Sequence, residues 1–530
     1  MKRRIGYIAI IAALLISCQR KETSELDRTA YLEEITIKQL QDGYREKRFT
    51  VEQVVNDYLK RIELLDKKGP CLNSIISVNP DALKIAKELD KEIANGKIRG
   101  PLHGIPVILK DNIDTRDSMP TTAGATVLKN SYVGRDSWVA AKLREAGAVI
   151  IGKSNLSEWA NFRASRSSSG WSGVGGQTRN PYELDRNPCG SSSGSGVAVS
   201  ANLCAFAIGT ETDGSIVCPS NNNGIVGLKP TVGLISRSGI VPISFTQDTP
   251  GPMCRSVSDV AYSLGAMVGP DPNDSKTLDP NAKFYSDYTQ FLRLDGLMGK
   301  RIGFITNASG FHHKVDTLMK KAIADIRRMG AEVFEVNLPI DPAVNSAEFE
   351  VLLYEFKDGL NRYFAGLGEM APIKSLEELI KYNLTDSVEL RYFNQHLLEL
   401  ALSKGDLNSP EYKKALETMQ NGIRQNGIDK VMDENKLDLL IIPTGSPAWK
   451  TDLILGDNYI GGNSSYAAMA GYPSITVPMG NIDGLPVGIS FIGRAWSEPV
   501  LIEAAYSYEQ GTKHRIKPKF KGMMNEDGSH

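Results

Sequence analysis

Residues 189–233 read CGSSSGSGVAVSANLCAFAIGTETDGSIVCPSNNNGIVGLKPTVG, and this segment indicates the expected architecture. A turn rich in glycine and serine at 190–196 leads into the apolar run 197–208, and a second turn of small residues follows at 209–215. Flexible linkers have a similar composition, but they do not usually lie between apolar elements in the middle of a domain. Backbone N–H groups in such turns can converge on an anion. The segment therefore predicts buried elements joined by turns that form a functional site.

On both sides of this segment, strand and helix patterns alternate along the chain. Apolar runs typical of buried strands occur at 105–109, 148–151, 206–209, 301–306, 332–336, 439–442, 474–477 and 488–492. Helical spacing of apolar residues occurs at about 50–65, 81–94, 137–146, 257–267, 314–329 and 498–508. This alternation predicts a single large α/β domain with a central, mostly parallel mixed β-sheet covered by helices on both faces. The charged, helix-patterned segment 341–435 is expected to be a helical excursion over the sheet.

The composition excludes several classes of partner. The 530 residues carry 61 Lys+Arg and 62 Asp+Glu, a net charge of −1, so no basic surface for a nucleic-acid partner is expected. The six cysteines form no CxxC pair or Cys/His cluster, and the histidines lack metal-ligand spacing apart from the adjacent His312 and His313. We therefore predict no metal and no cofactor, and the sequence leaves disulfide pairing and oligomeric state open.

The amino terminus has the pattern of an export signal. Three basic residues at 2–4 precede the apolar run 5–16, which is shorter than the roughly 20 residues of a membrane-spanning helix. The run ends in Leu15-Ile16-Ser17-Cys18, which resembles the bacterial lipoprotein box with Cys18 as the lipidation site. We therefore expect a signal peptide at 1–17, a tether at 18–29, the domain at 30–515 and a polar tail at 516–530. An uncleaved anchor is the alternative.

This pattern also predicts a location. An exported bacterial lipoprotein would lie in the cell envelope, either facing the periplasm or in the outer membrane. It would contact the membrane only through its lipid anchor, because no later segment reaches 18 consecutive apolar residues.

Two formal motif matches carry little weight. Residues 147–154 match the phosphate-loop pattern, but the middle residues Ala-Val-Ile-Ile favour a strand over a loop that curls round phosphate. Residues 190–194 match the nucleophile elbow of α/β-hydrolases, and His514 follows in the required chain order. An elbow needs a buried strand directly before it, whereas 179–188 is polar and contains two prolines. An esterase of the α/β-hydrolase type therefore stays a minor alternative.

Several segments in order resemble the amidase signature family. They are Gly104-Ile-Pro-Val-Ile-Leu-Lys-Asp-Asn112, Gly190-Ser-Ser-Ser-Gly-Ser195, Thr210-Glu-Thr-Asp-Gly-Ser-Ile216 and Gly224-Ile-Val-Gly-Leu-Lys-Pro-Thr-Val-Gly233. The similarity spans about residues 30–515, and within the family the 211–219 segment looks most like that of bacterial peptide amidases. The resemblance implies an amidohydrolase that cleaves a carboxamide C–N bond to an acid and ammonia or an amine. The substrate would be the C-terminal amide of a peptide or a small neutral amide.

The resemblance also implies the catalytic residues. It places the nucleophile on Ser215, the bridging cis-serine on Ser191 and the base on Lys110, and backbone N–H groups of Thr212, Asp213 and Gly214 at the oxyanion. A lysine base must be neutral, so its pKa must fall from about 10.4 towards 7, which burial can achieve. An acyl-serine intermediate on Ser215 would then be hydrolysed by water.

The sequence departs from the commoner pattern of the family at two positions that concern the substrate. Asp213 stands where many members have glycine, and it can crowd the acyl pocket. Val217 stands where members acting on acidic acyl groups have an arginine for the substrate carboxylate. A solute-binding lipoprotein of a peptide importer is an alternative of a different class. It fits the length and the amino-terminal pattern but explains none of the serine motifs.

Overall fold

The computed structural model describes residues 25–522. The predicted signal peptide at 1–17, the lipidation site Cys18 and the last residues of the predicted tail lie outside the described residues. Among residues 25–522, no helix is long and apolar enough to cross a membrane.

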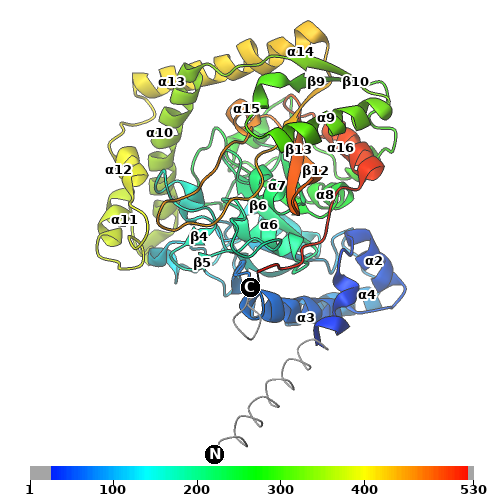
Figure 1. Ribbon diagram of the computed structural model, residues 1–530. Coiled ribbons are helices and arrows are strands. Elements are labelled where there is room, and N and C mark those ends of the chain that lie inside the picture. Colours follow the sequence, from blue (N-terminus) through cyan, green and yellow to red (C-terminus); the bar gives the residue numbers. More distant parts are fainter. Residues whose placement is uncertain (1–24, 523–530) are drawn as a thin grey trace, which may run out of the picture.

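A large mixed sheet forms the centre of the molecule (Figure 1). Its eleven strands lie in the order β1-β3-β2-β6-β8-β7-β12-β13-β11-β9-β10 across residues 25–522. Their bounds are β1 Ile75–Val78, β2 Pro106–Lys110, β3 Val149–Ser154, β6 Phe206–Glu211, β7 Val226–Lys229, β8 Thr249–Cys254, β9 Arg301–Ile305, β10 Glu332–Val336, β11 Leu439–Pro443, β12 Ser474–Ile482 and β13 Leu485–Ile492. Strands β4 (Trp171–Ser172) and β5 (Gly176–Gln177) form a separate small hairpin.

The predicted mixed sheet in a single domain is confirmed, but the expectation that it is mostly parallel is wrong: within residues 25–522 four of its strand pairs are parallel and six are antiparallel. Parallel pairing joins β3, β2 and β6 near one end of the sheet, where β1 is an antiparallel edge strand, and β11, β9 and β10 at the other end. The strands between these blocks pair antiparallel. Strands β12 and β13 are joined by a tight turn at 483–484, and such a hairpin connection makes neighbouring strands antiparallel.

Helices flank this sheet. Helices α6 and α7 pack together on its central strands, and α8, α9 and α16 form another group against the sheet. Within residues 25–522 and outside 341–435, the structure has the α-helices α2 Ile37–Arg45, α3 Val51–Arg61, α4 Ala82–Ala94, α5 Trp138–Glu145, α6 Ser193–Ser200, α7 Val217–Asn222, α8 Val257–Leu264, α9 His313–Arg328, α15 Ser465–Ala470 and α16 Glu498–Thr512. The main core contains the β2 and β6 residues Val107, Ile108, Leu109, Phe206, Ala207 and Ile208, all fully buried.

Five further helices occupy the segment predicted to be a helical excursion. They are α10 Pro342–Gly366, α11 Leu376–Asn383, α12 His396–Leu402, α13 Pro410–Ile423 and α14 Asp429–Asn435, and they lie on the left and top of Figure 1. Helix α10 buries apolar residues on two of its sides. Its residues Val344 and Val351 join the core beside β9 and β11, whereas Phe356 and Phe364 join a second core with α11 and α12.

The structure agrees with the rejection of both formal motifs. Residues 149–154 form the fully buried strand β3, so this segment is not a loop that could enclose a phosphate. An elbow would require a buried strand before Ser191, but this segment is a loop. The hydroxyl of Ser192, the central serine of the motif, donates to the carbonyl of Thr210. His514 lies against the ring of Tyr508.

Candidate active site

Lys110 is the last residue of β2, which pairs parallel with β6. Leu109 of β2 is in register with Ile208 of β6. Lys110, the next residue of β2, and Thr210, two residues after Ile208 in β6, therefore lie near the same edge of the sheet. The Lys110 side chain is fully buried. The apolar strand that the sequence predicted therefore delivers a lysine into the protein interior.

Three oxygen atoms surround the Lys110 nitrogen. Its Nζ atom lies 2.7 Å from Ser191 Oγ, 2.8 Å from Thr210 Oγ1 and 3.1 Å from the Thr210 carbonyl oxygen. A neutral amine has two N–H donors and one lone pair. If the two N–H groups donate to the two Thr210 oxygens, the lone pair remains for the hydroxyl hydrogen of Ser191. Thr210 thus orients the amine towards Ser191.

Burial lowers the pKa of Lys110 from its usual value to about 7, since desolvation disfavours the ammonium form. The negative charges of Asp248 and Glu211 act in the opposite direction and keep the pKa from falling further. The requirement that followed from the sequence, a lysine that can lose its proton near neutral pH, is thus met by the environment in the structure.

Ser191 and Ser215 come from different segments that lie side by side. Ser191 is fully buried and follows a cis peptide bond from Gly190. Ser215 is 6% exposed and lies between β6 and α7. The backbone N–H of Ser192 donates to the carbonyl of Ser215 at 3.1 Å, which connects the two segments directly. The structure therefore brings together Lys110, Ser191 and the Ser215 turn.

The turn that carries Ser215 is shaped by Glu211 and Gly214. Glu211 is buried, and its Oε2 accepts hydrogen bonds from the backbone N–H groups of Ile216 at 2.7 Å and Val217 at 3.0 Å. Gly214 has a φ of +81°, and a Cβ there would lie 2.8 Å from Ser464 Oγ. A side chain at this position would therefore be both strained and crowded, which explains the glycine before Ser215.

The other predicted oxyanion residues have side chains that point to neighbouring elements. Thr212 Oγ1 donates to Asp248 at 2.5 Å, and Asp248 also accepts from the backbone N–H groups of Ile243 and Ser244. Asp213 accepts a hydrogen bond from Ser465 Oγ of α15 at 2.6 Å and is partly exposed. These side-chain contacts hold the loop and leave its backbone as the candidate binder of an oxyanion.

A cavity of about 180 Å³ adjoins this site. Thr210 and Thr212 line it on the side of the catalytic candidates, and Ile240, Val241 and Ile243 supply apolar walls. Arg237 also lines the cavity, but its guanidinium is paired with the carboxylate of Asp274. The cavity therefore offers an apolar surface beside the catalytic candidates, and its arginine already has an acidic partner.

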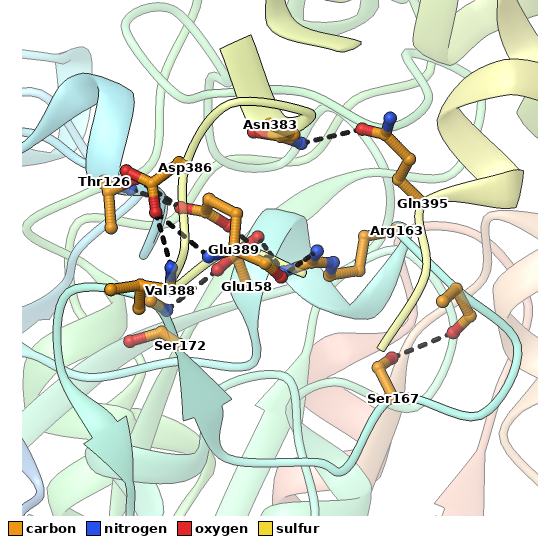
Figure 2. A network of polar contacts seen from close by, with 12 residues as sticks. Thr126, Glu158, Arg163, Ser167, Ser172, Asn383, Asp386, Val388, Glu389 and Gln395 are labelled. Atoms are coloured by element: carbon orange, nitrogen blue, oxygen red, sulfur yellow. Dashed lines mark hydrogen bonds and ion pairs between the residues drawn. The ribbon is translucent and has the colours of Figure 1, made fainter. Parts of the chain in front are cut away.

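A buried charged cluster lies next to the segment that is hydrogen-bonded to the backbone of Ser191. The backbone N–H of Ser157 donates to the carbonyl of Ser191 at 3.0 Å. The next residue, Glu158, pairs with Arg163 at 2.7 Å, and Arg163 also contacts Glu389 at 3.1 Å (Figure 2). Glu389 comes from the connection between α11 and α12, so the helical excursion contacts the segment 157–163, whose Ser157 is hydrogen-bonded to Ser191. Burial raises the pKa of Glu158 well above its usual range, although Arg163 opposes this shift.

Sequence reasoning missed three features of the site: the orienting contacts of Thr210, the backbone acceptor Glu211, and a disulfide between Cys189 and Cys218. Thr210 and Glu211 belong to the quoted segment 210–216, so their position was a signal. The role of Thr210 depends on a contact with the neighbouring strand β2, and that of Glu211 on the folding of its own turn back onto the carboxylate. Within residues 25–522, no group of three or more His, Cys, Asp or Glu side chains is placed to hold a metal ion.

Comparisons with known proteins agree with the motifs. The amidase family model matches residues 53–502. A probable amidase from Arabidopsis thaliana is 42% identical over 516 residues, which cover 96% of this chain and 96% of that protein. A putative amidase from Schizosaccharomyces pombe is 38% identical and is covered to 87%, with 92% of this chain aligned. The X-ray structure of a peptide amidase from Stenotrophomonas maltophilia superposes with a TM-score of 0.88 at 49% identity, over 92% of this chain and 99% of that one.

The same comparisons correct the predicted location. Relatives at 38–42% identity come from a plant, a fission yeast and a filamentous fungus, and eukaryotic amidases are not bacterial lipoproteins. The prediction of an exported bacterial lipoprotein in the cell envelope is therefore wrong. Its basis was a short amino-terminal pattern that is independent of the folded domain, so the motifs of the domain could not support it.

Proposed function

The chain belongs to the amidase family and hydrolyses amide C–N bonds, and from this premise we propose that Ser215, Ser191 and Lys110 carry out the reaction on a neutral carboxamide. The observation that supports these roles best is the 2.7 Å contact between Lys110 Nζ and Ser191 Oγ in a fully buried environment. A buried lysine with a pKa near 7 can accept a proton without a histidine.

In the proposed reaction, Ser215 Oγ attacks the carbonyl carbon of the amide. Its proton passes to Ser191 Oγ while the hydroxyl proton of Ser191 passes to the neutral amine of Lys110. The resulting ammonium returns a proton through Ser191 to the departing nitrogen, the C–N bond breaks, and ammonia or an amine leaves. Water then attacks the acyl ester by the same proton route and regenerates the Ser215 hydroxyl with release of the acid.

The negative charge on the carbonyl oxygen needs donors during both attacks. We assign this role to the backbone N–H groups of Thr212, Asp213 and Gly214, which precede the nucleophile. Glu211 and the contact of Thr212 with Asp248 hold this backbone in place, so the donors need not reorganise as charge develops.

The preferred substrate is a neutral amide, and the C-terminal amide of a peptide fits this class. An acidic acyl group would find apolar Val217 where an arginine would be needed, and Arg237 in the adjoining cavity is paired with Asp274. The name of the solved Stenotrophomonas maltophilia enzyme, a peptide amidase, supports the peptide class.

The test combines covalent labelling with turnover. A fluorophosphonate should label Ser215, which mass spectrometry of the digested protein would locate, and an amidated dipeptide should release ammonia. Ser215→Ala should abolish both, and Ser191→Ala and Lys110→Ala should each lower kcat about 1,000-fold or more, because the three residues act as a unit. The control Ser263→Ala removes a buried hydroxyl on α8, away from these residues, and should keep activity.

Two results would contradict the assignment. Retained turnover in Lys110→Ala would remove the proposed base, and absence of any label on Ser215 would remove the nucleophile. Comparing amidated dipeptides with free acyl amides and with amides of dicarboxylic acids would then test the substrate class. Faster turnover of the acidic amides would overturn the preference for neutral substrates.

A further inference from the structure

A covalent bridge lies directly beside both serines. Cys189 precedes Ser191 by two residues and Cys218 follows Ser215 by three, and the two cysteines form a disulfide with their Cα atoms 5.9 Å apart. We propose that this disulfide positions the Ser191 and Ser215 hydroxyls for proton transfer, so that Cys189 and Cys218 are positioning residues for amide hydrolysis. This inference rests on the proposed function.

Each cysteine is held firmly to its own serine segment. The backbone N–H of Cys189 donates to Asn187 Oδ1 at 2.8 Å, and its carbonyl accepts from Ser193 Oγ at 2.6 Å. The backbone N–H of Cys218 donates to the carbonyl of Gly214 at 2.8 Å, across the residue Ser215 itself. A displacement of either sulfur is therefore passed on to the adjoining serine.

Besides the packing of α6 against α7, hydrogen bonds link the two segments. Ser192 N–H donates to the carbonyl of Ser215 at 3.1 Å, and Asn223 Nδ2 donates to the carbonyl of Pro188 at 2.9 Å. Each such bond contributes about 1 kcal/mol net, whereas the disulfide sets an upper limit to the separation of the segments. The bridge is therefore the covalent link that limits how far the two serine segments can move apart.

The chemistry is sensitive to this separation. Proton transfer needs heavy-atom distances of about 2.6–3.2 Å between the partners. A misplacement of about 1 Å can cost about 100-fold in rate. Without the bridge, the Ser215 turn and the Ser191 segment can separate, so we expect the loss in kcat rather than in KM.

The bridge can be opened chemically without changing the sequence. A dithiol reductant attacks one sulfur, forms a mixed disulfide, and closes into a cyclic disulfide. The dithiol is oxidised by two electrons, and Cys189 and Cys218 are reduced to two thiols that take up its two protons. Among residues 25–522, Cys71, Cys204 and Cys254 are free thiols, so the dithiol has one bridge to act on there.

The first experiment uses a mutant cycle. Cys189→Ala, Cys218→Ala and the double variant should each lower kcat on an amidated dipeptide about tenfold or more, with KM changed less than about twofold. Because each single change already opens the bridge, the double variant should lose no more than a single one. The control Cys71→Ser alters an exposed free thiol and should keep the wild-type kcat. Thermal unfolding of each variant checks that it is folded at the assay temperature.

The second experiment uses the wild-type chain, which avoids any defect in folding of the variants. Dithiothreitol should lower its kcat to that of the double variant, reoxidation should restore it, and the double variant should not respond. Mass spectrometry of the peptides that contain Cys189 and Cys218 reports the state of the bridge. A reduced wild type with unchanged kcat would overturn the proposal, as would folded variants with full turnover.

Failure of the proposed function would look different. The oxidised wild type would then neither hydrolyse any amide nor be labelled at Ser215, and the positioning role would fall with it. In contrast, an oxidised enzyme that is active and remains equally active after reduction would refute the disulfide inference alone.

Discussion

At the scale of single residues, Lys110 shows how burial can lower the pKa of a lysine far enough for the role of base that we propose for it. Its stem continues the apolar strand β2, and its nitrogen meets Ser191 and Thr210 instead of water. Burial then lowers its pKa to about 7, so the amine can lose its proton near neutral pH. The same lysine at the surface would stay protonated and could not accept a proton.

The pH profile of the enzyme should report this group. Below the pKa of Lys110, the amine is protonated and cannot accept the proton of Ser191, so activity should be lost as pH falls through about 7. We expect kcat/KM for an amidated dipeptide to rise with pH and reach a plateau above this value. Measurement of kcat/KM between pH 5.5 and pH 9 at constant ionic strength would show this rise, the acidic limb of the pH profile.

A variant at Asp248 tests the cause of that limb. The negative charge of Asp248 raises the pKa of Lys110, so Asp248→Asn should move the limb to lower pH while keeping a similar side-chain shape. A limb that stays at the wild-type position in this variant would mean that another group controls the profile.

At the scale of elements, the site depends on loops that distant helices hold in place. Glu389, from the connection between α11 and α12, is fully buried and accepts from the backbone N–H and the hydroxyl of Thr126, each at 2.7 Å. It also contacts Arg163, which pairs with Glu158 (Figure 2). Glu158 follows Ser157, whose backbone N–H donates to the carbonyl of Ser191. The excursion therefore anchors a segment that is about 230 residues away in sequence.

Removal of Glu389 should be costly for stability. Glu389→Ala leaves Arg163 and Thr126 buried with fewer partners, so we expect the free energy of unfolding to fall by about 3 kcal/mol in urea titrations. Glu389→Gln keeps the size and one acceptor and should lose less. The control Glu399→Ala changes an exposed residue of α12 and should alter stability by less than about 0.5 kcal/mol. Equal stability of Glu389→Ala and Glu399→Ala would show that the cluster contributes nothing.

At the scale of the whole molecule, the helical excursion shares its cores with the rest of the chain. One face of α10 packs with α13 and the end of the sheet at β9 and β11, and another packs with α11, α12 and residues 123–128. The sheet itself has a continuous core with the helices around it. Among residues 25–522, each core to which α10 contributes also contains residues from outside the excursion.

The molecule should therefore unfold as one cooperative unit. Tryptophan fluorescence and far-UV circular dichroism should give coincident urea transitions, because Trp159 lies in the core that α10 shares with α11 and α12. Two separated transitions would show that the excursion, residues 341–435, folds on its own.

The amino-acid sequence by itself determined the class of fold, the strands β2, β3 and β6 and the family, and it supplied Lys110, Ser191 and Ser215 as the candidate catalytic residues. Short-range patterns carry this information: apolar runs define the strands β2, β3 and β6, and small residues mark the two turns on either side of the apolar run 197–208. The location was predicted wrongly because a short amino-terminal pattern carries no information from the folded domain.

Only the tertiary structure decided which groups meet. The antiparallel middle of the sheet, the pairing of Cys189 with Cys218 and the two contacts of Thr210 with Lys110 join residues that are between 29 and more than 200 positions apart. Local propensity says nothing about such pairs, because they form only when the chain has buried its apolar strands side by side. The lowered pKa of Lys110 has the same origin, since desolvation depends on everything that surrounds the nitrogen and not on its neighbours in sequence.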